Sequence, residues 1–90
     1  PLSAAAELRR GEAREGLGDV REGARAYLSA FTLEQQGPNA AEALFRLGAA
    51  LGRLGQTPEA CATLGEVSVR FPGSASVADA DAAMRNIGCS

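Results

Sequence analysis

The sequence predicts an all-α domain of two antiparallel helical hairpins followed by a C-terminal capping helix. One observation is an internal repeat, because residues 4–22 align without a gap on residues 41–59 at a shift of 37 residues. The other is helical apolar spacing, with Leu44, Leu47 and Leu51 at i, i+3 and i+7. Duplicated units of this length are typical of stacked repeat proteins. We therefore expect the hairpins to stack as a right-handed α-α superhelix.

The two copies agree at eight positions, which include small and charged residues as well as apolar ones. The identical pairs are Ala4/Ala41, Ala6/Ala43, Arg9/Arg46, Gly11/Gly48, Ala13/Ala50, Leu17/Leu54, Gly18/Gly55 and Glu22/Glu59. We treat residues 1–90 as one domain with repeat one at 3–37, repeat two at 39–74 and a capping helix at 76–88.

Five helices are expected, at residues 4–16, 20–34, 40–54, 58–70 and 76–87. Capping signals precede four of them: Asp19 with Glu22, Asn39 with Glu42, Thr57 before Pro58, and Ser76 with Asp79. Gly18 and Gly55 stand where a helix ends and the next has not begun. The last helix carries one apolar stripe, formed by Val77, Ala80, Met84 and Ile87. It is expected to cover the open end of the second hairpin, as repeat stacks require for solubility.

Gly11 and Gly48 lie inside predicted helices at the same phase of the repeat. Glycine in a helix interior costs about 1 kcal/mol relative to alanine. Its recurrence therefore indicates a steric purpose, in which the missing side chain lets the partner helix come close. Ala60 is expected to supply the matching small surface in the second unit.

Charge and hydropathy exclude two classes of partner. Nine arginines and eleven acids are scattered along the chain, for a net charge of −2. This arrangement lacks the basic patch that binds nucleic acid. Arg46, Arg53 and Arg70 interrupt the apolar stretches of the second half, so no run approaches the roughly 20 residues that span a bilayer. We expect no nucleic-acid partner and no membrane insertion.

The inventory of reactive side chains does not predict an enzyme. Catalysis needs titratable groups that converge in a pocket, and the chain has neither His nor Lys. Asp79 and Asp81 are two residues apart and so do not share a helix face. Gly16 and Gly18 sit at a turn between helices with no strand before them, unlike a nucleotide-binding glycine loop. We expect no catalysis and no cofactor.

The two cysteines, Cys61 and Cys89, leave two readings open. A metal site of two thiols alone is not expected, since structural zinc usually takes four Cys or His ligands. The pair is either a disulfide, which needs an oxidising compartment, or two separate thiols. A bridge would close a loop of roughly 29 residues and contribute about 3–3.5 kcal/mol. Under oxidising conditions we expect the disulfide.

The second unit resembles the tetratricopeptide repeat throughout its length. The matching positions are Leu44, Leu47, Gly48, Leu51, Gly55, Ala60, Leu64, Val67 and Pro72. The first unit departs from the pattern, because Glu7 and Arg10 replace large apolar residues and Gln35 replaces the closing proline. Its first helix is therefore expected to be a weak member of the core, which frays or packs against something outside this chain.

The segment "FRLGAALGRLGQTPEACATLGEVSVRFPGS" resembles more narrowly the C-terminal repeat of the YbgF/CpoB family. The similarity is best over residues 18–75. It implies a periplasmic, non-enzymatic protein of the Tol-Pal system of Gram-negative bacteria. Such a protein binds TolA and coordinates outer-membrane constriction with septal peptidoglycan synthesis during cell division.

The expected partner is thus TolA, with the peptidoglycan-synthesis machinery as a second candidate. Family members join a trimerising coiled coil to these repeats, but this chain has no heptad segment, so no oligomeric state is inferred. Two alternatives stay open: the repeat domain of an outer-membrane assembly lipoprotein, and a general scaffold with other partners.

In a stack of such hairpins, the first helix of each unit lines the concave side. The candidate contact residues there are Leu8, Glu12, Glu15, Glu42, Phe45, Ala49 and Arg53. Phe45 is the candidate anchor, because a large aromatic residue beside Arg and Glu can fill a partner's pocket. The alternative is that Phe45 packs under the capping helix or against the preceding unit.

Overall fold

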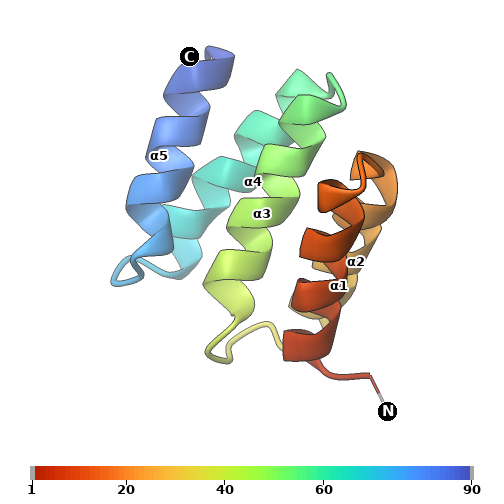
Figure 1. The fold of residues 1–90 in the computed structure, drawn as a ribbon. Coiled ribbons are helices and arrows are strands. Elements are labelled where there is room, and N and C mark those ends of the chain that lie inside the picture. Colours follow the sequence, from red (N-terminus) through yellow and green to blue (C-terminus); the bar gives the residue numbers. More distant parts are fainter. Residues whose placement is uncertain (1, 90) are drawn as a thin grey trace.

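The computed structural model describes residues 2–89, and these fold into helices joined by short turns (Figure 1). The helices are α1 (Ala4–Gly16), α2 (Val20–Leu33), α3 (Ala40–Arg53), α4 (Thr57–Arg70) and α5 (Ser76–Ile87). α1, α3 and α5 form one layer, and α2 and α4 lie behind them. The expected all-α architecture of two hairpins and a capping helix is confirmed.

The helix limits agree with the expected ones to within one residue at each end. Gly18 has φ +86° and Gly55 has φ +80°. This left-handed conformation favours glycine, because it has no Cβ to clash with the backbone. The Asp19 side chain accepts a hydrogen bond from the Glu22 amide at 3.3 Å, so the expected cap of α2 is confirmed.

The expected capping box of α3 is wrong. Asn39 precedes the helix but its side chain makes no capping hydrogen bond. Its backbone is helical, at φ −98° and ψ −3°, rather than extended as an N-cap requires. The Asn39 amide donates instead to Glu34 Oε1 at 3.4 Å. Glu42, the expected reciprocal partner, accepts from the Arg46 guanidinium at 2.8 Å.

The starts of α4 and α5 also differ from expectation. Thr57 is the first helical residue and Gln56 the N-cap, without a side-chain capping bond. Ser76 is likewise already helical and follows Ala75 as N-cap. The Ser76 amide donates to Ser74 Oγ at 3.0 Å, so Ser74 satisfies one of the free amide groups at the start of α5.

Each hairpin closes around a glycine, as expected. A Cβ on Gly11 would overlap Tyr27 Cε1, and one on Gly48 would lie 2.7 Å from Leu64 Cγ. Tyr27 and Leu64 are both 0% exposed, so neither side chain has space to withdraw. They are also related by the 37-residue shift. The steric purpose of the two glycines is confirmed.

The prediction that Ala60 lies against Gly48 is wrong, because the residue that lies against Gly48 is Leu64. Ala60 lies one helical turn earlier on α4 and faces Gly52, where a Cβ would be 3.9 Å from the Ala60 Cβ. The glycine therefore accommodates a large side chain and not a small one.

Two apolar clusters form the core. The first joins α1, α2 and α3 through Leu8, Ala24, Tyr27, Ala30, Ala43 and Ala50. The second joins α3, α4 and α5 through Leu44, Leu64, Val67 and Ala80, and Phe31 packs against both clusters. Leu8 is 0% exposed. The expectation that α1 is a weak member of the core is therefore wrong, because its helix docks on α2 through Leu8 and Gly11.

Glu7 is the buried charged residue of this hairpin, and it is paired with Arg10. The Arg10 Nη2 lies 2.9 Å from Glu7 Oε1, and Nε donates to the other oxygen at 3.3 Å. The two positions that depart from the repeat pattern thus satisfy each other. The hydrogen bonds from Arg10 hold the pKa of the Glu7 carboxyl below its usual 4.5, against the effect of burial.

Acidification should therefore remove stability that the Glu7–Arg10 pair supplies. Because the folded-state pKa of Glu7 is depressed, this contribution is complete above about pH 4.5 and is lost as the pH falls through the folded-state value. Urea unfolding at pH 7 and at several values below 4.5 measures the effect. Glu7→Gln should be less stable at pH 7 and should lose less stability on acidification than the parent protein. An equal loss in both proteins contradicts the assignment.

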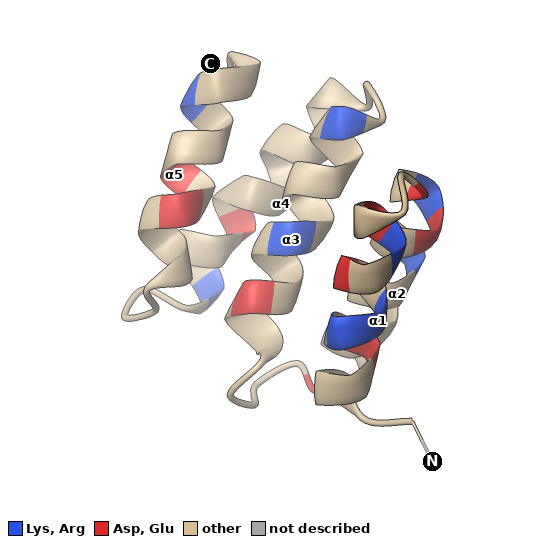
Figure 2. Cartoon of the chain, in the orientation of Figure 1, with Lys and Arg blue, Asp and Glu red and all other residues tan. Residues whose placement is uncertain are grey.

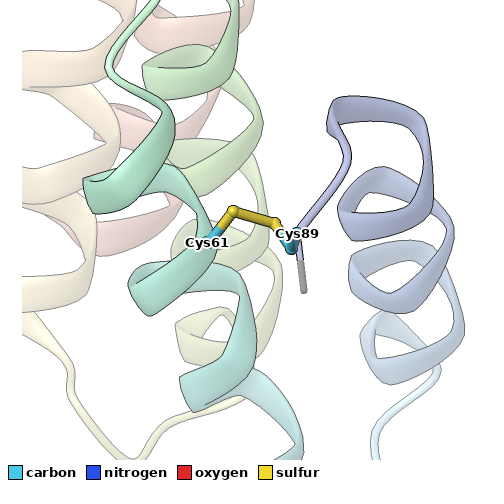
Figure 3. The surroundings of a disulfide bond; sticks show 2 residues. All are labelled: Cys61 and Cys89. Atoms are coloured by element: carbon cyan, nitrogen blue, oxygen red, sulfur yellow. A yellow bond between two sulfur atoms is a disulfide. The ribbon is translucent and has the colours of Figure 1, made fainter.

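The disulfide between Cys61 and Cys89 fastens α5 to α4 (Figure 3). The two Cα atoms are 5.6 Å apart, and the bridge closes a sequence separation of 28. Of the two readings left open by the sequence, the disulfide is confirmed.

α5 occupies the place that the first helix of a third unit would take. Ala80 stands 37 residues after Ala43, and both are buried. Arg85 stands 37 residues after Gly48. A helix packed on α5 as α4 packs on α3 would meet this arginine at the position that needs glycine.

Candidate protein-binding surface

The candidate surface is the side of α1, α3 and α5 that faces away from α2 and α4, which we call the inner face. Both α1 and α3 carry acidic and basic positions along their length (Figure 2). Two pockets lie on this face, one between α1 and α3 and one between α3 and α5. Arg53 lines both of them.

The polar pocket, between α1 and α3, has a volume of about 390 Å³. Its lining residues are Glu12, Glu15, Gly16, Val20, Tyr27, Arg46 and Arg53. The Tyr27 hydroxyl donates to Glu15 Oε1 at 2.6 Å, and Arg53 Nη1 donates to Glu15 Oε2 at the same distance. Burial, and then the Glu15 carboxylate, raise the pKa of the Tyr27 phenol far above its usual 10. Tyr27 is therefore a permanent donor to Glu15 at neutral pH.

Ion pairs across the inner face tie α1 to α3. Arg46 lies 2.8 Å from Glu42 on its own helix and 3.6 Å from Glu12 on α1. Arg9 on α1 lies 2.6 Å from Glu12 and 3.8 Å from Glu42. The four side chains form a network of ion pairs, which orients Arg46 at the wall of the polar pocket.

The apolar pocket, between α3 and α5, has a volume of about 220 Å³. Its lining residues are Ala49, Gly52, Arg53, Leu64, Ala83, Asn86 and Ile87. Leu64 is fully buried and forms the floor, as Tyr27 does in the polar pocket. Small side chains on both walls keep this pocket open.

The two pockets are the same place in successive repeats. A shift of 37 residues converts the defining residues of the polar pocket into those of the apolar one: Glu12 into Ala49, Glu15 into Gly52, Gly16 into Arg53, Tyr27 into Leu64 and Arg46 into Ala83. The duplicated fold thus presents one site twice, first with charged and hydroxyl groups and then with small and aliphatic ones.

Four of the seven predicted contact residues line these pockets. They are Glu12, Glu15, Ala49 and Arg53. Glu42 lies beside them and holds Arg46. Their contact with a partner stays a prediction.

The other two predicted contacts are placed differently. Leu8 is fully buried between α1, α2 and α3 and so is corrected to a core residue. Phe45 is partly buried and packs against the cluster that includes Leu44 and Ala80. The observed position of Phe45 agrees with the alternative prediction, in which this residue packs beneath the capping helix.

Sequence reasoning missed Tyr27 and Ala83 as lining residues. Tyr27 belongs to the rear layer, and its ring reaches the inner face between α1 and α3 because Gly11 leaves space for it. The sequence signal that could have identified Tyr27 is the 37-residue shift. It pairs Tyr27 with Leu64, and each of these two residues lies opposite one of two equivalent glycines.

Residues 2–89 hold no group of three or more His, Cys, Asp or Glu side chains arranged to bind a metal ion. Over the same residues no helix has the length and apolar character to cross a membrane.

Comparison with known protein families matches residues 42–74 to the tetratricopeptide repeat. The matched segment runs from the first turn of α3 through α4 and the following turn. No curated protein and no solved structure matches the chain. Residues 42–74 and the all-helical fold are therefore similar to the tetratricopeptide repeat, a helical repeat that typically serves as a non-enzymatic protein–protein interaction module.

Proposed function

We propose that this domain binds TolA in the periplasm through its inner face. In this role it is an adaptor of the Tol-Pal system that coordinates outer-membrane constriction with septal peptidoglycan synthesis in cell division. The observation that carries the proposal of a binding face is the pair of equivalent pockets joined by Arg53. Adjacent pockets give a partner segment two anchor points, and buried anchors supply most of the energy in protein interfaces.

The identity of the partner is supported by the resemblance of residues 18–75 to the YbgF/CpoB repeat. Location is supported by the Cys61–Cys89 disulfide. Disulfides persist in oxidising compartments such as the bacterial periplasm and are rare in the cytosol. Both arguments lead to the cell envelope.

Binding of purified TolA fragments, measured by titration calorimetry, tests the proposal. Arg53→Ala should weaken binding about 5- to 30-fold, since an arginine anchor at the centre of an interface is worth roughly 1–2 kcal/mol. Arg53 is the informative choice because its side chain is 56% exposed and lines both pockets.

The matched control is Arg25→Ala on α2. Arg25 is also exposed and ion-paired, at 3.4 Å from Glu22, but it lies in the rear layer. It should bind TolA as the parent protein does. Absence of binding at high micromolar TolA rejects this partner. An equal loss in both variants rejects the inner face as the binding surface.

A further inference from the structure

We infer that the groove between the first half of α2 and the second half of α3, which we call the rear groove, binds an acidic polypeptide segment that inserts an aliphatic side chain. This groove lies on the opposite side of the domain from the inner face, since neither α1 nor α5 contributes to its lining. It therefore serves a second partner, distinct from one that binds at the inner face.

Leucine side chains form most of the rear groove. α3 supplies Leu47, Leu51 and Leu54, which are partly buried, and α2 supplies Leu28, which is 51% exposed. The cavity that they enclose has a volume of about 200 Å³. A Leu, Ile or Val side chain that enters it removes apolar surface from water on both partners. Because these leucines line a hollow, the groove suits an inserted side chain better than a flat membrane surface.

An aromatic contact at the other end of the rear layer explains where the groove opens. The Phe31 and Phe71 rings meet edge to face with their centroids 6.4 Å apart, and the Arg70 guanidinium lies 5.7 Å from the centre of the Phe31 ring. α2 and α4 are thus in contact near their last residues. At the start of α4 the groove is lined instead by Gln56, the residue before the helix. The leucines of α3 stay accessible there.

The charged residues of the groove lining are two arginines, Arg21 and Arg25, one helical turn apart on α2. Both are exposed. Within residues 2–89, Arg21 takes part in no ion pair. Arg25 lies 3.4 Å from Glu22 through Nε, and its side chain is 70% exposed, so its outer nitrogens remain accessible. A carboxylate can therefore bind at this rim without breaking an existing pair, whereas a cation would be repelled by both arginines.

The internal repeat indicates that the fold does not require these side chains. The 37-residue shift pairs the three rim residues of α2 with smaller or uncharged ones on α4: Arg21 with Pro58, Arg25 with Ala62 and Leu28 with Gly65. α4 forms the same kind of helix in the equivalent place without the two charges and the large apolar side chain. Binding of a partner accounts for their presence on α2.

The distance between the rim and the leucines sets the spacing in the partner segment. In an extended chain, residues i and i+2 point to the same side and are about 7 Å apart. Arg21 and Arg25 are themselves separated by about 5–6 Å between Cβ atoms. A segment with Asp or Glu two positions from Leu, Ile or Val thus places a carboxylate at the rim while the aliphatic side chain enters the groove.

The probe that tests this chemistry is the acetylated and amidated peptide Ser-Asp-Ser-Leu-Ser-Asp-Ser, titrated into the isotopically labelled domain and followed by NMR. Its carboxylates flank the leucine on both sides, so either chain direction places one at the arginines. It should shift resonances of α2 and α3. Replacing both Asp by Asn should weaken binding about 3- to 10-fold at low salt, and high salt should reduce this difference. Replacing Leu by Ser should weaken binding about tenfold.

Protein variants locate each half of the specificity. Arg21→Gln with Arg25→Gln removes the charged rim, so the Asp and Asn peptides should bind this variant with nearly equal affinity. Leu28→Ala removes part of the apolar wall and should weaken binding of the probe about threefold. The matched control is Arg14→Gln, because Arg14 is an exposed arginine of α1 that does not line the rear groove. It should bind both peptides as the parent protein does.

Circular dichroism confirms that each variant is folded, and the peptide comparison on the parent protein stands without them. The inference is overturned if the probe causes no shifts at about 10 mM, if the Asn peptide binds as well as the Asp peptide, or if the shifts map to α1 and α5. Self-association of the domain that Arg21→Gln with Arg25→Gln abolishes would make a second copy the occupant and also overturns it. Binding of phosphatidylglycerol vesicles with which the probe does not compete does the same.

TolA separates this inference from the proposed function. TolA binding that Arg53→Ala weakens and that Arg21→Gln with Arg25→Gln leaves unchanged assigns the two faces to two partners. Peptide binding at the rear groove without any TolA binding rejects TolA and retains the acidic partner. TolA binding that is lost in the Arg21 and Arg25 variant places TolA in the rear groove and overturns the second partner.

Discussion

Reduction of the Cys61–Cys89 disulfide should lower the free energy of unfolding of this domain by about 3–3.5 kcal/mol. The bridge spans a sequence separation of 28, and cutting it restores the entropy of that loop to the unfolded chain. Small domains have only about 5–15 kcal/mol of stability in total. The melting temperature should accordingly fall on the order of 15–25 °C, since 1 kcal/mol corresponds to roughly 4–8 °C at this size.

Urea and thermal unfolding with and without a reductant measure this effect. The control is the double variant Cys61→Ser with Cys89→Ser, which should unfold where the reduced parent does and ignore the reductant. An unchanged midpoint of the parent protein on reduction, with loss of the disulfide verified by thiol titration, contradicts the prediction. Native-state hydrogen exchange should show the largest loss of protection in α5, because the bridge fastens that helix to α4.

The first helix of each hairpin could be predicted because the internal repeat contains it twice. Leu44, Leu47 and Leu51 give the period of α3, and positive-φ glycines such as Gly18 and Gly55 end the first helix of each hairpin region. Repetition at a fixed shift separates such signals from chance. The hairpin pairing follows, because a short turn leaves consecutive helices antiparallel.

The caps were less predictable, because one acidic residue can serve several partners. Glu42 stands three residues after Asn39, as a capping box requires, but it also stands four before Arg46 and pairs with it. Local spacing does not decide between these two uses. The backbone conformation of Asn39, fixed by the turn that precedes it, does.

Leu8 shows the corresponding limit for the binding surface. A helical wheel identifies the side of α1 that faces α2. It does not identify the part of the α1 surface that α3 covers. Leu8 joins the cluster that includes Ala43 of α3. Glu12 and Glu15, one and two turns further along, emerge at the pocket. Which residues are exposed on the inner face therefore depends on how the repeats stack. The spacing of residues within one unit does not carry this information.

Replacing Gly48 by alanine should destabilise the domain by about 1–3 kcal/mol, although alanine is the better helix former. The added Cβ would lie 2.7 Å from Leu64 Cγ and 3.3 Å from the Leu64 amide nitrogen. Leu64 is fully buried and at the centre of the second cluster, so relief requires α3 and α4 to move apart. Chemical denaturation of the variant, compared with the parent protein, measures the loss.

The matched substitution is Gly65→Ala on α4, where a Cβ would meet nothing within 4 Å. It should stabilise the protein by up to about 1 kcal/mol through helix propensity alone. A double-mutant cycle then separates contact from propensity. With Leu64→Ala in the background, Gly48→Ala should cost much less or become favourable, because the atoms it displaces are gone. An undiminished cost in that background would show that the close approach of α3 and α4 is not what requires glycine at position 48.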